Sequence, residues 1–120
     1  MKNIQLTCAH ALIKYLIAQK TLIDGKKVPL FPGAFGIFGH GNVACLGQAL
    51  QENQKDLPTW RGHHEQNMAL TGIAYSRAKR RKQIFIATSS VGPGSTNMIT
   101  AAAVAMSNRI PILFLPGDTF

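Results

Sequence analysis

The sequence predicts an α/β fold, in which a parallel sheet is flanked by helices as in Rossmann-like domains. Two observations predict it. Short apolar runs bounded by turn residues alternate with segments whose apolar residues recur at helical spacing, which builds parallel sheets with right-handed crossovers. The composition also fits one globular domain, because 46% of the 120 residues are hydrophobic and 15% are charged.

The first half of the chain predicts two helices and two strands. In order, these elements are a helix over residues 6–17, a strand at Ala34–Phe38, a helix at Val43–Leu50 and a strand at Leu57–Arg61. Thr7 can cap the first helix with its hydroxyl group. The turn residues Asp24-Gly25 and those from Pro29 to Gly33 end that helix.

The second half continues the alternation. Its elements are a helix at Glu65–Arg81, a strand at Ile84–Thr88, a helix at Ser95–Ser107 and a strand at Pro111–Leu115. Three apolar runs are predicted to be inner strands of the sheet, namely Phe35–Phe38, Ile84–Thr88 and Ile112–Leu115. In the first of these helices, four residues are expected to face inward: Met68, Gly72, Ile73 and Ala74.

A lone acidic residue and a bare glycine loop follow neighbouring strands of the predicted sheet. Glu65 begins a helix in the segment H-H-E-Q-N-M-A, and Gly92-Pro93-Gly94 follows the strand that ends at Ser89. Ligands of parallel sheets bind outside the carboxyl ends of the strands, where glycines let the backbone approach them. Ser95 can cap the helix after the loop. The sequence therefore predicts a cofactor site that these two turns share.

Glu65 has two interpretations on position alone. An acidic residue in the first turn of a helix complements the helix dipole. Alternatively, a buried carboxyl group at this position can share a proton with a ligand nitrogen near neutral pH. The two interpretations differ in burial, because only the second requires that the carboxyl group be shielded from solvent.

Two other interpretations of the chain remain, one from the turn after the first strand and one from the net charge. Gly39-x-Gly41-x-x-Ala44 matches the dinucleotide fingerprint between a strand and a helix, and Arg61 can bind a 2′-phosphate, so an NADP-binding domain is an alternative. A basic adaptor without enzymatic activity is a third, because the formal net charge is +8. No nucleic-acid recognition motif accompanies this charge, so nucleic acid is not expected as a partner.

Cysteine, histidine and hydropathy patterns predict neither metal ligands nor membrane spans. Cys8 and Cys45 lie on apolar helix stripes without C-x-x-C spacing, which is typical of small reduced core residues in a cytoplasmic protein. His63 and His64 are adjacent on an extended segment and point to opposite faces, so they make a poor chelate. No apolar run approaches the roughly twenty residues of a membrane helix, and no secretory signal is expected.

Taken together, the motifs resemble the pyrimidine-binding domain of thiamine-diphosphate enzymes of the acetolactate synthase superfamily. The resemblance is carried by F-G-I-F-G-H-G-N, H-H-E-Q-N-M-A, T-S-S-V-G-P-G-S-T-N and P-I-L-F-L-P-G-D, in that order. Within the superfamily, G-H-G-N, T-S-S-V-G-P-G and P-G-D-T-F resemble the trihydroxycyclohexanedione hydrolase branch of inositol catabolism. Most other members have a shorter T-S-G-P-G loop. An acetolactate synthase-like carboligase is the alternative within the family.

The resemblance implies roles for particular residues. Glu65 corresponds to the glutamate that hydrogen-bonds N1′ of the aminopyrimidine and so promotes loss of the C2 proton of thiamine diphosphate. Residues of the glycine loop and its helix are implied to line the pyrimidine, namely Gly92, Pro93, Gly94 and Asn97. Residues of the first turn are implied to face a small-molecule substrate, namely Gly39, His40, Gly41 and Asn42.

The resemblance also implies that residues 1–120 carry half of a site. Family members bind the diphosphate and its Mg²⁺ through a Gly-Asp-Gly segment of a separate domain, and this chain has no such segment. We therefore expect the N-terminal part of a larger homodimeric enzyme, with a pyrimidine domain incomplete at its C-terminus and inactive alone. The dimer interface is expected to cover the helices Glu65–Arg81 and Ser95–Ser107, to bury Glu65 and to hide Met68 and Met98.

Overall fold

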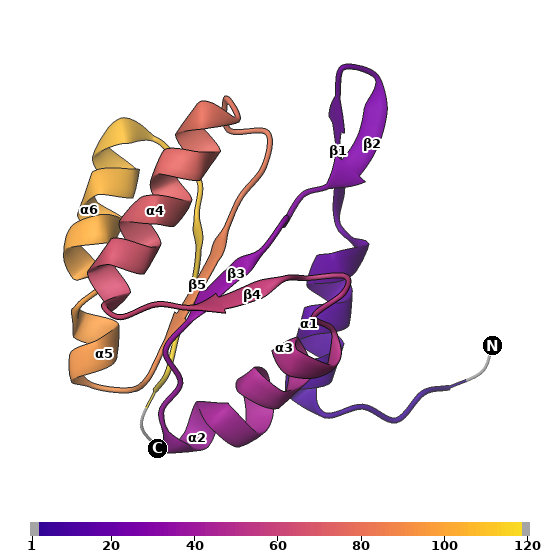
Figure 1. The fold of residues 1–120 in the computed structure, drawn as a ribbon, viewed down its shortest axis with the longest axis vertical. Coiled ribbons are helices and arrows are strands. Elements are labelled where there is room, and N and C mark those ends of the chain that lie inside the picture. Colours follow the sequence, from indigo (N-terminus) through magenta and orange to yellow (C-terminus); the bar gives the residue numbers. More distant parts are fainter. Residues whose placement is uncertain (1–2, 119–120) are drawn as a thin grey trace.

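A four-stranded parallel sheet forms the centre of the computed structural model, which describes residues 3–118 (Figure 1). In spatial order its strands are β4 (Thr59–Arg61), β3 (Ala34–Gly36), β5 (Ile86–Ser89) and β6 (Leu113–Pro116). The predicted α/β fold class is confirmed. However, β6 is an edge strand of the described sheet, so the expectation that Ile112–Leu115 is an inner strand is wrong for these residues. The apolar pattern failed here because it reports burial on the faces and not the order of strands.

Helices cover both faces of the sheet. They are α1 (Cys8–Ala18), α2 (His40–Asn42), the π-helical turn η1 (Val43–Gly47), α3 (Gln48–Glu52), α4 (Glu65–Ala78), α5 (Pro93–Thr96) and α6 (Ile99–Asn108). Figure 1 shows α4 and α6 on one side of the sheet and α1 and α3 on the other. Successive side chains of a strand point to opposite faces of the sheet, which explains the two hydrophobic cores. Ile86 of β5 packs with α1 and α3, whereas Ala87 packs with α4 and α6.

A β-hairpin replaces the plain turn expected between the first helix and the first strand. Its strands β1 (Lys20–Ile23) and β2 (Lys26–Pro29) pair antiparallel, and Ile23 lies opposite Lys26. The two residues between them, Asp24 and Gly25, have positive φ angles of 50° and 77°. Asp-Gly is a favoured pair for such two-residue hairpin turns, so the signal was in the sequence and was missed. Figure 1 shows the hairpin projecting away from the parallel sheet.

Two predicted helices end or break earlier than expected. The helix from Glu65 ends at Ala78, because Arg80 and Arg81 adopt positive φ angles and the Arg81 amide bonds back to the Ser76 carbonyl at 2.8 Å. Ala74 is exposed and does not face inward. The predicted helix Ser95–Ser107 is divided into α5 and α6, which are separated by two residues. This break leaves Asn97 at the end of α5, beside the start of α4.

Both cysteines are exposed, which contradicts their expected place in the core. Cys8 lies in the first turn of α1, away from the buried residues Ile13 and Leu16. Cys45 lies within η1, where π-helical bonding departs from the α-helical period that the sequence analysis assumed. Thr7 caps α1 as predicted, since its hydroxyl accepts from the His10 amide at 3.2 Å. Within residues 3–118, no helix is long and apolar enough to cross a bilayer.

Candidate functional site

Three turns at the carboxyl ends of β3, β5 and β6 converge on Ser90. The parallel register brings these ends together, with Gly36 opposite Thr88 and Ser89 opposite Pro116. A Cβ atom on Gly39 would lie 2.7 Å from the Ser90 Cβ, and one on Gly117 would lie 2.9 Å from the Val91 nitrogen. Any larger residue at these two glycines would therefore push the turns apart.

Hydrogen bonds hold these three turns together. The Asn42 amide group donates to the Ser89 carbonyl at 3.0 Å, which ties the first turn to β5. The Ser95 hydroxyl lies 2.7 Å from the Ser90 carbonyl and 2.9 Å from the Gly117 carbonyl, and can donate to either. Ser95 was expected to cap the helix after the glycine loop. The structure instead has Gly92 at the cap position, and the Ser95 side chain links the turns after β5 and β6.

Glu65 begins α4 and is buried within a single chain, with 9% of its surface exposed. One carboxylate oxygen, Oε2, accepts a hydrogen bond from the Asn97 amide group at 3.1 Å. The other, Oε1, faces Gly94, where an added Cβ would lie 3.1 Å away and would also overlap the Ser90 hydroxyl. Because it is buried and bonded to a residue of another helix, Glu65 differs from an acidic residue that only complements a helix dipole.

These features fit the aminopyrimidine of thiamine diphosphate. Gly94 lets the backbone of α5 approach Glu65 Oε1 closely, and Gly92 reaches a φ angle of 62° that lets the loop turn sharply into α5. A carboxyl group fixed through one oxygen offers the other to a single ring nitrogen. The structure thus brings two of the predicted pyrimidine-side residues, Gly94 and Asn97, into contact with Glu65. Gly92 is exposed and has no such contact. Pro93, also predicted there, is the first residue of α5 and is exposed.

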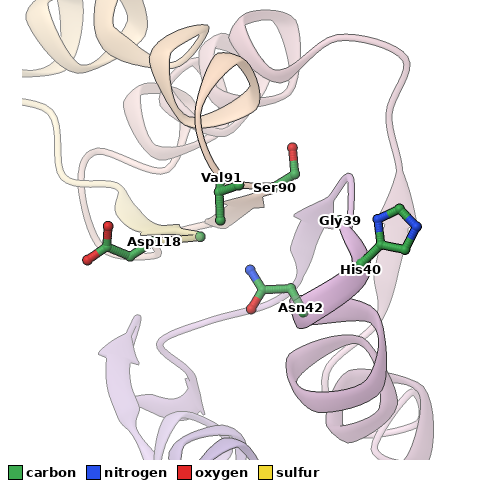
Figure 2. Close-up of a pocket in the computed structure, with 8 residues that line it drawn as sticks. Gly39, His40, Asn42, Ser90, Val91 and Asp118 are labelled. Carbon is green, nitrogen blue, oxygen red and sulfur yellow. The ribbon is translucent and has the colours of Figure 1, made fainter. Parts of the chain in front are cut away.

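A cavity of about 560 Å³ lies on the other side of Ser90. Its lining is contributed by all three turns: Gly39, His40, Gly41, Asn42, Ser90, Val91, Gly117 and Asp118. The four residues that the sequence placed on the substrate side are therefore together here. Figure 2 shows the Asn42 amide directed toward Val91, whereas the His40 ring points away from Val91. Glu65 does not line this cavity, so Ser90 separates two distinct regions of the site.

Comparisons with known proteins identify the family of this domain. Residues 32–120 match the family described as thiamine pyrophosphate enzyme, N-terminal TPP binding domain.

The chain belongs to this family of TPP-binding domains.

Curated relatives match along the whole chain. The chain is 52% identical over 120 residues to a protein named 3D-(3,5/4)-trihydroxycyclohexane-1,2-dione hydrolase from Clostridium tetani. It is 53% identical over 120 residues to the protein of that name from Geobacillus thermodenitrificans, and 50% identical over 119 residues to that of Listeria innocua. The matches cover 99–100% of this chain but 19% of each of these relatives. The chain thus spans about a fifth of their length.

The alternative interpretations are not favoured. In a dinucleotide-binding turn, the bare backbone of the glycines approaches a pyrophosphate. In this TPP-binding domain, Gly39 lacks a side chain where it meets Ser90, and Arg61 lines a separate hollow with Phe38 and Val43. The relatives described above are named hydrolases, which does not favour a carboligase or a basic adaptor.

The histidine pair that was predicted to make a poor metal chelate lies on the surface. His63 and His64 are both exposed, and among residues 3–118 no three His, Cys, Asp or Glu side chains come together as a metal site. Thr119 and Phe120, the end of the P-G-D-T-F motif, lie outside the described residues.

Sequence reasoning missed the contacts of Ser90, Val91 and Gly117. The longer T-S-S-V-G-P-G loop was the available signal, since it contains the two residues that separate the regions of the site.

Proposed function

We propose that this chain binds the aminopyrimidine half of thiamine diphosphate in a carbon–carbon bond hydrolase that acts on trihydroxycyclohexane-1,2-dione. The observation that carries the proposal is the Glu65 carboxyl group, buried in the chain and bonded to Asn97, with Oε1 facing the bare Gly94. Family membership supports the cofactor, and the name of the relatives supports the substrate.

Each residue of the Glu65 region has a defined task in this proposal. Glu65 hydrogen-bonds N1′ of the aminopyrimidine and exchanges a proton with it, while Asn97 holds the carboxyl group in orientation. The backbone of Gly92, Pro93 and Gly94 lies along the ring. The bound cofactor supplies the nucleophilic carbon for cleaving a bond next to a carbonyl group. On the far side of Ser90, residues 39–42 face the substrate.

The complete site needs parts that this chain does not contain. We propose that the diphosphate and Mg²⁺ are bound by another domain of a longer protein, since the relatives are about five times longer. We also propose that the pyrimidine domain continues beside β6. Beside its open edge lies an apolar groove lined by Cys8, Leu12 and Cys45. The free thiols of Cys8 and Cys45 support a reducing, cytoplasmic location.

We propose a homodimer through the outer face of α6. Ile99 and Met106 lie on one stripe of this helix and are 63% and 84% exposed, which is unusual for apolar side chains of this size. Met68 and Met98, which the dimer interface was expected to hide, are already buried within one chain, so their burial does not depend on a partner.

Sedimentation of the complete protein tests this dimer. We expect a dimer that Ile99→Glu/Met106→Glu dissociates, because each change places a carboxylate in an apolar interface. Thr100→Glu is the matched control, since Thr100 is exposed on α6 beside this stripe. A wild type that sediments as a monomer at high concentration would contradict the proposal.

The proposed activity is tested with the complete protein and trihydroxycyclohexane-1,2-dione. We expect ring opening to a carboxylic acid, observed by NMR, only when thiamine diphosphate and Mg²⁺ are both present. We expect no turnover by the 120-residue chain alone, which lacks the diphosphate site. A complete protein that leaves the dione intact and instead joins two 2-oxo acids would contradict the hydrolase and support a carboligase.

A further inference from the structure

Ser90 and Val91 form the boundary between the two regions of the site. Figure 2 shows their side chains projecting in opposite directions, with Val91 directed toward Asn42. The Ser90 hydroxyl lies near Gly94, on the Glu65 side, whereas Val91 lines the cavity of about 560 Å³. A two-residue segment thus contacts the predicted cofactor region with one side chain and the cavity with the next.

The backbone of this segment is held on every side. The Ser90 carbonyl accepts from the Ser95 hydroxyl at 2.7 Å and lies 3.1 Å from the Ser89 hydroxyl. The Ser89 carbonyl accepts from the Asn42 amide group and from the Gly117 nitrogen, each at 3.0 Å. Gly39 approaches the Ser90 side chain closely, and Gly117 approaches the Val91 nitrogen. The backbone that carries Val91 is therefore packed against both neighbouring turns, although the Val91 side chain is 42% exposed.

The lining of the cavity combines one apolar side chain with polar ones. Among residues 3–118, Val91 is the only aliphatic side chain that lines it, and the polar residues of the lining are His40, Asn42, Ser90 and Asp118. Of these, Ser90 directs its hydroxyl to the Glu65 side. Because the bond to Ser89 uses one N–H of the Asn42 amide group, its oxygen and its second N–H remain for a ligand hydroxyl. A hydroxylated six-membered ring has the matching surface, with C–H groups on its faces and hydroxyl groups at its edge.

We propose that Val91 is a specificity-determining residue, which packs against the C–H face of a hydroxylated cyclic dione in this cavity. The inference rests on the proposed function for the identity of the substrate. Val91 does not take part in proton transfer. It selects a flat ring over an open-chain substrate, because an aliphatic side chain on a rigid backbone favours an apolar ring face over a hydrated chain.

The first test compares variants of the complete protein. We expect Val91→Ala to lower kcat/KM for the cyclic dione by about tenfold or more, chiefly through KM, as removal of a packing group from a pocket does. Val91→Thr, which keeps the shape and adds a hydroxyl, should also raise KM, and Val91→Ile should retain wild-type activity. Val43→Ala is the matched control, because Val43 is 55% exposed and does not line this cavity. Equal kcat/KM values for wild type and Val91→Ala would overturn the proposal.

Two further measurements separate this proposal from the proposed function. Exchange of the cofactor C2 proton should be unchanged in Val91→Ala, and a slowed exchange would overturn the proposal by placing Val91 on the cofactor side. Methyl NMR of the complete protein should show that the cyclic dione shifts the Val91 resonances and not those of Val43. Shifts without any turnover would support binding of the dione in this cavity but contradict the hydrolase activity. Turnover without shifts at Val91 would show that the dione does not bind against Val91 and would overturn the proposal.

Discussion

The two sides of Ser90 are built differently. On the Glu65 side, the carboxyl group is 9% exposed, one oxygen is bonded to Asn97, and Gly94 has no room for a Cβ atom. On the other side, a cavity of about 560 Å³ is open, and a Cβ on Gly41 would meet nothing within 4 Å. A close-packed region and an open cavity thus lie on opposite sides of one residue. The comparison teaches that the same three turns can pack tightly on one side and leave the other side open.

The largest expected effect tests the tight side. Glu65→Gln in the complete protein should keep the fold but slow exchange of the cofactor C2 proton by about two to four orders of magnitude, because an amide cannot exchange a proton with N1′ as a carboxyl group does. Hydrogen–deuterium exchange at C2, followed by NMR, measures this rate. Glu52→Gln is the control, since Glu52 is a surface carboxylate of α3. Equal exchange rates in wild type and Glu65→Gln would remove Glu65 from the mechanism.

A pair of glycine substitutions compares the two sides directly. Gly94→Ala should lower the free energy of unfolding by about 1–3 kcal/mol, because its methyl group would overlap the Ser90 hydroxyl and crowd Glu65 Oε1. Gly41→Ala should be neutral or slightly stabilising, since its methyl group projects into open space on a short helix. Urea denaturation of both variants gives the comparison. If Gly41→Ala cost as much as Gly94→Ala, the cavity side would be packed as tightly as the Glu65 side.

A smaller effect is expected for the residue that orients the carboxyl group. Asn97→Ala removes the hydrogen bond to Glu65 Oε2 and should cost about 1–2 kcal/mol of stability, as the loss of a hydrogen bond to a charged group does. Asn108→Ala is the matched control, because the Asn108 amide group bonds only to a carbonyl of its own helix. Thermal unfolding measures both. If Asn97→Ala were as stable as Asn108→Ala, the hydrogen bond between Asn97 and Glu65 would make no net contribution to stability.

The smallest effect concerns a contact remote from both sides. Hydrogen bonds from Gln48 and His10 lower the pKa of the Glu52 carboxyl group below its usual 4.5. A lowered folded-state pKa contributes stability above pH 4.5 that is lost as the pH falls through the folded value. Glu52→Gln should therefore flatten the acid dependence of stability below about pH 4.5 and leave C2 exchange unchanged. A change in C2 exchange would show that the surface of α3 is coupled to the site.

Local patterns in the sequence determined the fold class and the expectation that Glu65 lies near the glycine loop. The buried strand β5 is signalled by the apolar run Ile84–Ala87, because both of its faces are covered, and helices appear through their 3.6-residue period. Glu65 and the loop Gly92–Gly94 could be assigned to one region because each directly follows a strand, and parallel strands present their carboxyl ends at one edge. These inferences depend on neighbours along the chain.

The tertiary structure decided the features that depend on contacts between distant segments. The place of β6 at the edge follows from strand order, which an apolar run does not encode. The exposure of Cys45 follows from a π-helical turn, and the break before α6 accompanies the contact between Asn97 and Glu65, which are 32 residues apart. The division of the site by Ser90 needed three turns in contact. Such packing is set by the whole core, because each close approach is stabilised only when all the surrounding segments are in place.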